Sequence, residues 1–250
     1  MIDQSLLDLP ILHETLHEIV VVKPSGMAVE LTSDPRGTSL ISRVRRACPP
    51  SLDAKLPHRL DRVARGLVLV ALTPEAIAFH NEQIRARKWK KYYLARALAP
   101  RDRSIEALLG QHKAYLKRAR GRAEIVRSGG KPAFLEILAA HPAPGRAGQY
   151  HLLIKLLTGR FHQLRAMLAN LGAPLADDPL YGTDPPHHWR RRDLYLEHVA
   201  LRFTDYAHQT PRAVHWRDDP DRESVAPALR AQVEALAQTL AAGNKNKDMV

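Results

Sequence analysis

One carboxylate lies among basic side chains in the segment of residues 56–66, which reads Leu-Pro-His-Arg-Leu-Asp-Arg-Val-Ala-Arg-Gly. This acid is Asp61. Four basic or potentially basic residues flank it: His58, Arg59, Arg62 and Arg65. Nearby positive charge favours the ionised form of a carboxyl group. The glycine leads into an apolar run over residues 67–72, which is typical of a buried strand. We therefore take Asp61 as the candidate chemical centre of the chain.

The chain carries a large excess of positive charge. Its 38 Lys and Arg residues against 26 Asp and Glu give a formal net charge of +12 and a pI near 10.1. Side chains that neutralise phosphates release condensed counterions, so this balance favours a nucleic-acid partner. A surface kept soluble by positive charge is the alternative.

The most basic interval covers residues 111–131, where Glu124 is the single acid. Glycines interrupt this interval, which favours an arm or a hairpin over a packed helix. As a group its basic residues favour phosphate contact, although any one of them could belong to a solvated loop.

Apolar periodicity indicates short strands interspersed with a few helices. Strands are expected at residues 18–22, 67–72, 92–98, 134–138, 150–157 and 196–203. Helices are expected at residues 38–47, 73–88, 161–171 and 225–242. Because many of the strands are joined by short turns, the pattern predicts an α+β fold with a mixed, largely antiparallel sheet and flanking helices.

Metal and nucleotide sites find little support in the sequence. His187 and His188 are adjacent and so point in different directions, and no His-Glu-x-x-His or paired Cys-x-x-Cys motif is present. The adjacent acids at residues 177–178 and 218–219 are typical of solvated loops. Glycine-rich phosphate-binding motifs are also absent. We therefore expect no metal and no cofactor.

The single cysteine, Cys48, permits no internal disulfide and fits a reducing cytoplasm. It precedes two prolines, so we expect it in a loop, and a nucleophilic role for it is unsupported. The first ten residues lack the features of a signal peptide. No apolar run approaches the ~20 residues that cross a bilayer. We expect a soluble, cytoplasmic monomer that does not bind membranes.

Several motifs, taken in order, resemble those of the RluA family of RNA pseudouridine synthases, and the resemblance runs from about residue 11 to residue 205. Residues 19–27 (Ile-Val-Val-Val-Lys-Pro-Ser-Gly-Met) look like the family's entry strand and Lys-Pro-x-Gly turn. Residues 58–61 (His-Arg-Leu-Asp) match the signature of its catalytic aspartate, and residues 91–95 (Lys-Tyr-Tyr-Leu-Ala) match a Lys-x-Tyr-x-Ala strand. The second signature is matched by residues 158–165 (Thr-Gly-Arg-Phe-His-Gln-Leu-Arg), 171–175 (Leu-Gly-Ala-Pro-Leu) and 178–182 (Asp-Pro-Leu-Tyr-Gly). Each motif alone is weak, but their common order and compatible spacing make a strong signal.

The chain departs from the family pattern at four places. Ala64 and Arg65 stand where the family usually has Thr-Ser, and Met167 stands where a histidine is common. Asp177 occupies the start of a usual Gly-Asp pair, and Leu196-Glu197-His198 replaces a usual Leu-His. None of these changes touches the proposed nucleophile. Arg65 and its neighbours could therefore signal a divergent RNA substrate.

The resemblance implies a pseudouridine synthase catalytic domain over residues 1–220, followed by an amphipathic helix and a frayed tail over residues 221–250. No N-terminal S4-type RNA-binding domain is expected. The implied activity is an isomerisation of specific uridines in tRNA or rRNA, in which the N1–C1′ bond breaks and the base rejoins through C5. Such a reaction conserves atoms and needs no redox cofactor.

The resemblance also assigns roles to individual residues. Asp61 is expected either to attack C1′ or to assist elimination, and both routes stay open. Arg160 is expected to pair with Asp61, and Tyr93 to stack on or border the uracil. Arg59 is expected to grip a phosphate or to fill the space that the extruded nucleotide leaves.

The remaining candidates are supporting residues. For Arg165 and Gln163, a structural role as a salt bridge or a link between helix and strand is at least as well supported as substrate contact. For Lys23 a structural role and substrate contact are equally supported. His58 and Arg62 flank the aspartate, and Arg62 could serve structure alone. The main alternative function is a non-catalytic RNA-binding protein that retains the fold. A metal-dependent nuclease is disfavoured because no ligand cluster is visible.

Overall fold

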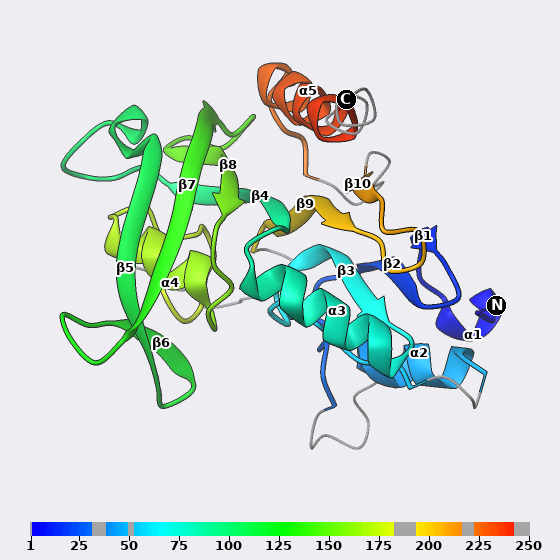
Figure 1. Ribbon diagram of the computed structural model, residues 1–250. Coiled ribbons are helices and arrows are strands. Elements are labelled where there is room, and N and C mark those ends of the chain that lie inside the picture. The colour runs from blue at the N-terminus through cyan, green and yellow to red at the C-terminus, as the bar shows by residue number, and fades with distance from the viewer. Residues whose placement is uncertain (1, 32–38, 50–52, 183–193, 217–222, 243–250) are drawn as a thin grey trace, which may run out of the picture. The chain divides into compact units, whose positions relative to one another are not determined.

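The computed structural model describes residues 2–31, 39–49, 53–182, 194–216 and 223–242 (Figure 1). Contacts between residues divide the chain into two units, and the chain passes between them more than once. The first unit comprises Met1–Lys90, His198–Asp218 and Ala237–Val250, and the second comprises Lys91–Glu197 and Asp219–Leu236. The domain boundary expected at residue 220 stays a prediction.

The first unit contains a sheet in which β1 (Ile11–Glu14), β2 (Glu18–Lys23), β3 (Arg65–Ala71) and β9 (Leu196–Thr204) follow one another. β10 (Pro211–His215) pairs with β9 in antiparallel fashion. β2 and β3 are also antiparallel, with Val20 opposite Leu69. Every residue of β2 is buried. Helices α1 (Gln4–Leu7), α2 (Leu40–Ala47) and α3 (Pro74–Arg85) belong to the same unit.

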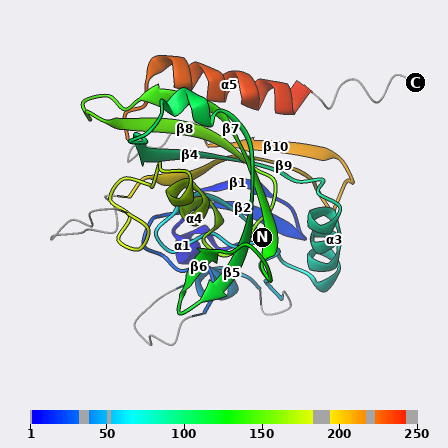
Figure 2. The ribbon, with the colours of Figure 1, turned by 90° about the vertical axis from the view of Figure 1, so that its left-hand side faces the viewer.

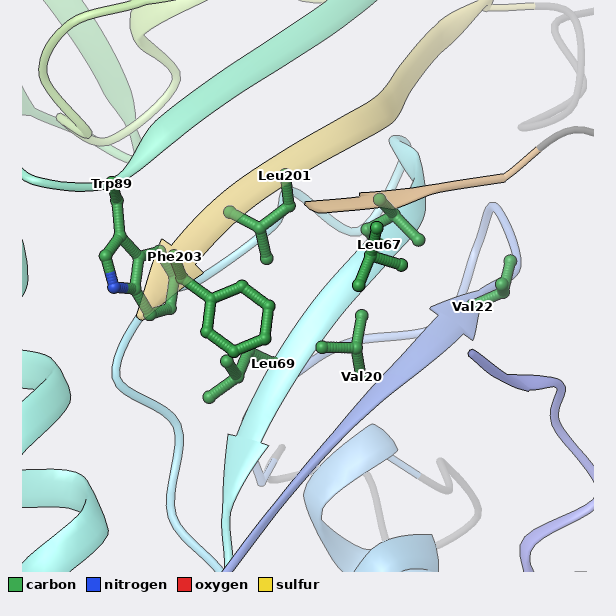
Figure 3. Packing of buried hydrophobic residues seen from close by; sticks show 8 residues of the cluster. Val20, Val22, Leu67, Leu69, Trp89, Leu201 and Phe203 are labelled. Atoms are coloured by element: carbon green, nitrogen blue, oxygen red, sulfur yellow. The ribbon is translucent and has the colours of Figure 1, made fainter. Parts of the chain in front are cut away.

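Side chains from β2, β3 and β9 converge in an apolar cluster that fixes the register of these strands (Figure 3). Successive residues of a strand point to opposite faces, so alternate residues of neighbouring strands meet on one face. The cluster consists of Val20, Val22, Leu67, Leu69, Trp89, Leu201, Phe203 and Val214. A shift of one residue in β3 would turn Leu67 and Leu69 away from this core.

The second unit contains the sheet order β4-β8-β7-β5-β6 (Figure 2). The strands are β4 (Lys90–Leu98), β5 (Gly110–Ala119), β6 (Arg122–Ile125), β7 (Lys131–Pro142) and β8 (Gln149–Leu156). Every pair of neighbours in this order is antiparallel. The unit also contains the short 3-10 helix η1 (Ile105–Leu108) and α4 (Gln163–Asn170), which contacts β6.

A buried arginine fastens the segment that leads into the last helix, α5 (Pro227–Ala242), to the second unit. Arg96 in β4 is only 1% exposed. Its guanidinium lies 2.7 Å from a carboxylate oxygen of Asp177 and 3.0 Å from one of Glu223. His151 approaches Glu223 at 3.0 Å. Burial raises the pKa of Glu223, but His151, Arg96 and Arg146 outweigh it, so the pKa lies below its usual value.

The fold confirms the predicted α+β class with its largely antiparallel sheet. All six predicted strands and four predicted helices are present, and Thr73 caps α3 as expected, accepting a hydrogen bond from the Ala76 amide. The basic interval forms the hairpin β5–β6. α4 begins two residues later than predicted because His162 adopts the left-handed conformation with φ +49°.

The elements that were not predicted from the sequence are short: α1, β1, η1 and β10. Cys48 lies outside α2, as predicted: it is the buried C-cap with extended backbone, and its amide bonds to the Val44 carbonyl. His187, His188, the acids at 218–219 and the expected frayed tail lie outside the described residues.

Neither a membrane-spanning helix nor a metal-binding cluster occurs in the described parts of the chain. Among their helices, none is long and apolar enough to span a membrane. Among the same residues, no three His, Cys, Asp or Glu side chains group closely enough to hold a metal ion.

Gly66 allows β3 and β9 to approach at the start of β3. Its φ is +105°, which L side chains rarely adopt. A Cβ atom on this residue would lie 2.3 Å from the carbonyl oxygen of His198, a backbone atom that cannot move aside. The glycine is therefore required both by its conformation and by the lack of space.

We predict that Gly66→Ala lowers the free energy of unfolding by about 3 kcal/mol or more, because backbone strain and a backbone clash add. Gly110→Ala is the matched control: its φ is +107°, but no atom lies within 4 Å of the place that a Cβ would take there. The Gly110→Ala variant therefore measures the cost of the backbone strain alone, which is about 1–2 kcal/mol. Urea denaturation of both variants measures the difference, and equal destabilisation would contradict the steric argument.

Candidate active site

Asp61 begins a tight turn between residues 61 and 64, closed by a hydrogen bond of 3.0 Å from the Ala64 amide to the Asp61 carbonyl. Within the first unit, this turn lies directly before β3. Ala64 is fully buried, whereas Asp61 is partly exposed. The turn therefore has an anchored end and leaves the carboxylate partly accessible to solvent.

Donors from the turn after β2 bind three successive carbonyl groups that follow Asp61. The Gly26 amide donates to the Arg62 carbonyl at 2.7 Å, and the Ser25 hydroxyl donates to the Val63 carbonyl at 2.7 Å. The Lys23 ammonium donates to the Ala64 carbonyl at 2.6 Å. We call residues 23–27 the anchoring turn, because they fix the backbone on which Asp61 is mounted.

Lys23 is the buried centre of the anchoring turn, with no exposed surface. Its ammonium also donates to the carbonyls of Pro24 at 2.8 Å and Met27 at 2.9 Å, so it ties its own turn to the Asp61 turn. Burial lowers the pKa of Lys23 to about 7; the Asp61 carboxylate opposes this decrease, and Arg62 and Arg65 add to it. Lys23 thus interacts electrostatically with Asp61 and acts structurally through the carbonyls of residues 24, 27, 62 and 64.

His58 is held as a neutral imidazole. Its Nε2 accepts a hydrogen bond of 2.9 Å from the Leu69 amide, and an atom that accepts from an amide carries no proton. Its ring packs edge-on against Trp89 and His198. In this arrangement His58 joins the Asp61 segment to the core of β3 and does not add a positive charge.

The three arginines near Asp61 have separate contacts. Arg59 is half-exposed and pairs with Glu30 at 2.9 Å, and Arg62 donates to the Gly26 carbonyl at 2.9 Å. The guanidinium of Arg65 lies over the ring of Trp216, 5.3 Å from its centroid. Arg62 therefore reinforces the anchoring turn, while Arg59 is held at the surface by one exposed ion pair, which is weak in water.

In the second unit, Gln163 organises the turn of residues 158–160. Its side-chain oxygen accepts from the Thr158 hydroxyl at 2.8 Å and from the Arg160 amide at 3.0 Å. Its side-chain nitrogen donates to the Phe134 carbonyl of β7 at 2.9 Å. Gln163 therefore ties this turn to the sheet. Arg160 is exposed, and its Nε donates to the Pro132 carbonyl at 3.2 Å.

Arg165 and Asp178 form a buried bidentate ion pair. Nε and Nη2 of Arg165 donate to the two carboxylate oxygens at 2.8 and 2.7 Å, and both side chains are nearly inaccessible to solvent. Asp178 also accepts from the amides of Leu180 and Tyr181. Such a fork-to-fork pair is directional and strong. Arg165 thereby holds the segment of residues 178–181 against α4.

The hairpin β5–β6 is attached to the start of α4 by arginines that stack on aromatic rings. Arg118 lies 4.3 Å from the centroid of Phe161, whose ring stacks on His162. Arg122 lies 5.2 Å from the centroid of Tyr181, and the Tyr181 hydroxyl accepts from the Ala123 amide at 2.6 Å. These contacts hold the hairpin on both sides of the turn at its tip and leave Lys117 and Arg120 exposed.

The candidate residues thus fall into two groups. Lys23, His58 and Arg62 support the Asp61 turn in the first unit, with Arg59 on its surface. Tyr93, Arg160, Gln163 and Arg165 belong to the second unit, where Tyr93 is buried on β4 opposite Ile154. Asp178 was predicted as a solvated loop acid and as part of a motif; the first prediction is wrong, because its side chain is fully buried in the pair with Arg165. The expected pairing of Asp61 with Arg160 stays a prediction.

The family model "RNA pseudouridylate synthase" matches residues 17–170. The dual-specificity RNA pseudouridine synthase RluA of Escherichia coli is 32% identical over 176 residues, which cover 70% of this chain and 78% of that protein. The chain belongs to the RluA family of RNA pseudouridine synthases.

Other members of the family are longer than the matched region. The ribosomal large subunit pseudouridine synthase D of Nitrosomonas europaea is 35% identical over 187 residues, which cover 71% of this chain but 51% of the relative. An uncharacterised RNA pseudouridine synthase of Chloroflexus aurantiacus is 32% identical over 205 residues, covering 60% of that protein. The chain therefore spans about half the length of several relatives that it matches.

Solved structures agree on the fold. Human RNA pseudouridylate synthase domain containing 1 has a TM-score of 0.66 at 22% identity, covering 95% of this chain and 96% of that one. Human RNA pseudouridylate synthase domain containing 4 has a TM-score of 0.64 at 16% identity, covering 94% and 95%. At these identities the likeness shows the fold.

We predict that Lys23→Met lowers the free energy of unfolding by about 2–4 kcal/mol, because it leaves buried carbonyl groups without donors. Ser25→Ala removes one hydrogen bond and should cost about 1 kcal/mol. Chemical denaturation at pH 7 compares the two variants. A Lys23→Met loss no greater than that of Ser25→Ala would contradict the central role of Lys23.

Lys23 should also leave a signature in the pH dependence of stability. Its pKa is lowered from 10.5 to about 7 in the folded state. Between these values the unfolded chain binds more protons, so this group makes stability rise with pH over the window from 7 to 10.5. We expect the rise to be smaller in Lys23→Met, measured by denaturation at several pH values. The same slope of stability against pH in Lys23→Met and in the wild-type protein would contradict the lowered pKa of Lys23.

Proposed function

We propose that this protein is an RNA pseudouridine synthase that isomerises specific uridines in tRNA or rRNA, with Asp61 as the catalytic carboxylate. The observation that carries this proposal is the anchoring turn, which binds the carbonyls of residues 62, 63 and 64 and so fixes the backbone at Asp61. Family membership supports the activity, since the matched region includes the Asp61 segment.

The proposed reaction needs a carboxylate and no cofactor. Asp61 either attacks C1′ as the N1–C1′ bond breaks, or removes a proton as the base is eliminated. In both routes the uracil turns and C5 bonds to C1′; this step breaks the Asp61–C1′ bond in the first route, and the ribose regains the removed proton in the second. The C5 proton is then lost while N1 gains one. A carboxylate suits these steps because it can stabilise positive charge at C1′, as in glycoside hydrolysis.

The proposed binding residues have distinct roles. Arg59 grips a phosphate, exchanging its exposed partner Glu30 for RNA. Tyr93 borders the uracil, and Arg160, exposed on its turn, contacts substrate. Arg165 supports this set through Asp178, because its guanidinium is engaged in the buried bidentate pair. A uridine must leave its stack to enter such a site, at a cost of a few kcal/mol.

We predict that Asp61→Asn abolishes pseudouridine formation in tRNA and rRNA transcripts while RNA affinity changes less than about threefold, because the amide keeps the shape but cannot act as a carboxylate. Asp53→Asn is the matched control, since Asp53 is half-exposed and pairs with Lys55 at the surface. Pseudouridine mapping and filter binding give the two readouts. Activity that survives in Asp61→Asn would overturn the mechanism.

The basic hairpin is proposed to contact the RNA backbone. Lys117 and Arg120 are exposed on it, whereas Arg118 and Arg122 are occupied by aromatic rings. Two exposed cations close together near the tip suit phosphate contact, in which affinity depends steeply on salt concentration.

We predict that Lys117→Gln with Arg120→Gln weakens RNA binding and reduces the slope of log affinity against log salt by about 2. Lys88→Gln with Arg230→Gln removes the same charge from exposed positions elsewhere and should leave the slope nearly unchanged. Binding titrations at several salt concentrations measure both. Equal effects of the two pairs would show that only total charge matters.

A non-catalytic RNA-binding protein with this fold is the second candidate, favoured by the basic surface alone. The two candidates are separated by mapping pseudouridines in total RNA from cells with and without the gene. A position that loses pseudouridine when the gene is removed identifies the target and supports the enzyme. Unchanged maps together with RNA binding would support the alternative.

A further inference from the structure

Lys91, the first residue of the Lys-x-Tyr-x-Ala strand, is a buried cation for which the described residues provide no acceptor. Its side chain is 8% exposed on β4. Among the described residues, no hydrogen bond or ion pair of its ammonium is found, and the Nζ atom is not fully shielded from solvent. Burial alone lowers the pKa of Lys91 to about 8, so the amine is still largely protonated at pH 7.

A buried charge without a partner is costly to the folded state. Lys23 shows the usual solution in this chain, since its ammonium donates to the carbonyls of Pro24, Met27 and Ala64. Lys91 finds no such compensation among the described residues, so its ammonium has hydrogen bonds left to donate to a bound molecule.

The position of Lys91 relates it to the candidate substrate-binding residues of the second unit. A Cβ atom on Gly159 would lie 3.3 Å from the Lys91 Nζ, so the ammonium lies against the turn that carries Arg160. Lys91 and Tyr93 are two residues apart on β4, and residues at that spacing point to the same face, about 7 Å apart along the strand. The absent side chain at Gly159 leaves room for the ammonium.

We propose that Lys91 contacts the uracil of the target nucleotide and stabilises the negative charge on the base when it leaves the ribose. This inference rests on the proposed function, because it needs Tyr93 to border the uracil. The Lys91 ammonium donates a hydrogen bond to a uracil carbonyl oxygen. This oxygen is the acceptor that the described residues do not provide.

The electron balance of the reaction explains why a cation is useful there. When the N1–C1′ bond breaks, its electron pair stays with N1, and the base becomes a uracil anion whose charge is shared with its carbonyl oxygens. C1′ receives electrons from the Asp61 carboxylate or from the C2′–H bond. When C5 attacks C1′, the electron pair of the base forms the new bond; the Asp61–C1′ bond breaks in the first route, and C2′ regains its proton in the second. The C5 proton is then lost and N1 gains one. Lys91 stabilises the anion between these two events without gaining or losing atoms.

The test is Lys91→Met, an apolar side chain of similar length, compared with Lys90→Met, which removes the exposed neighbouring lysine on the opposite face of β4. Three quantities are measured: the single-turnover rate of pseudouridine formation at saturating RNA, the affinity for the same RNA, and the melting temperature. We expect Lys91→Met to lose about 100-fold or more in rate, to keep its affinity within about threefold, and to melt at the same or a higher temperature. Lys90→Met should keep its rate.

Each other outcome overturns the proposal. A loss of affinity with an unchanged saturating rate would assign Lys91 to a phosphate, and a lower melting temperature or failure to fold would show a structural role. An unchanged rate with unchanged affinity would show no role in the reaction. A wild-type protein that forms no pseudouridine would instead overturn the proposed function, and the rate of that protein is measured first.

Discussion

The arrangement around Asp61 depends on one constraint: a lysine is buried between two turns, and its side-chain nitrogen donates to backbone carbonyls of both. Lys23 donates to Pro24 and Met27 in its own turn and to Ala64 beyond Asp61. The Ser25 hydroxyl and the Gly26 amide donate to the two carbonyls that precede that of Ala64 in the chain. Because removal of a buried donor leaves several acceptors unsatisfied at once, the two turns form or separate together. The backbone at Asp61 is thus positioned by hydrogen bonds to main-chain carbonyls that follow it in the sequence.

Local patterns predicted much of the fold. The β-branched run of β2 and the apolar run of β3 are long enough to identify buried strands, and Thr73-Pro74-Glu75 is a strong helix start. The short elements α1 and β1 could not be predicted, because four residues carry too little periodicity and their pairing is determined by tertiary contacts. The left-handed His162 shortened α4 for a reason that side-chain type does not reveal.

The candidate residues were selected by type and by motif, and their hydrogen-bond partners could not be predicted from the sequence. Asp61, Tyr93 and Arg160 were selected because motifs recur in order, whereas the partner of Arg165 is 13 residues away along the chain and is determined by packing. His58 was taken as potentially basic, yet the amide of Leu69 fixes it as an acceptor. Lys91 was identified in the sequence only as one residue of a motif. Its significance depends on its burial and its contacts in the fold, which a sequence pattern does not show.

Arg96 has a consequence for how the chain can be shortened. Its guanidinium is buried between Asp177 and Glu223, and Glu223 also accepts from His151. A protein cut near residue 220, where the sequence suggested a boundary, would lose one of the two carboxylates and leave positive charge in the core with half of its compensation. Glu223, shortly before α5, therefore contributes to the charge balance of the second unit and should be kept in any expression fragment designed for crystallisation.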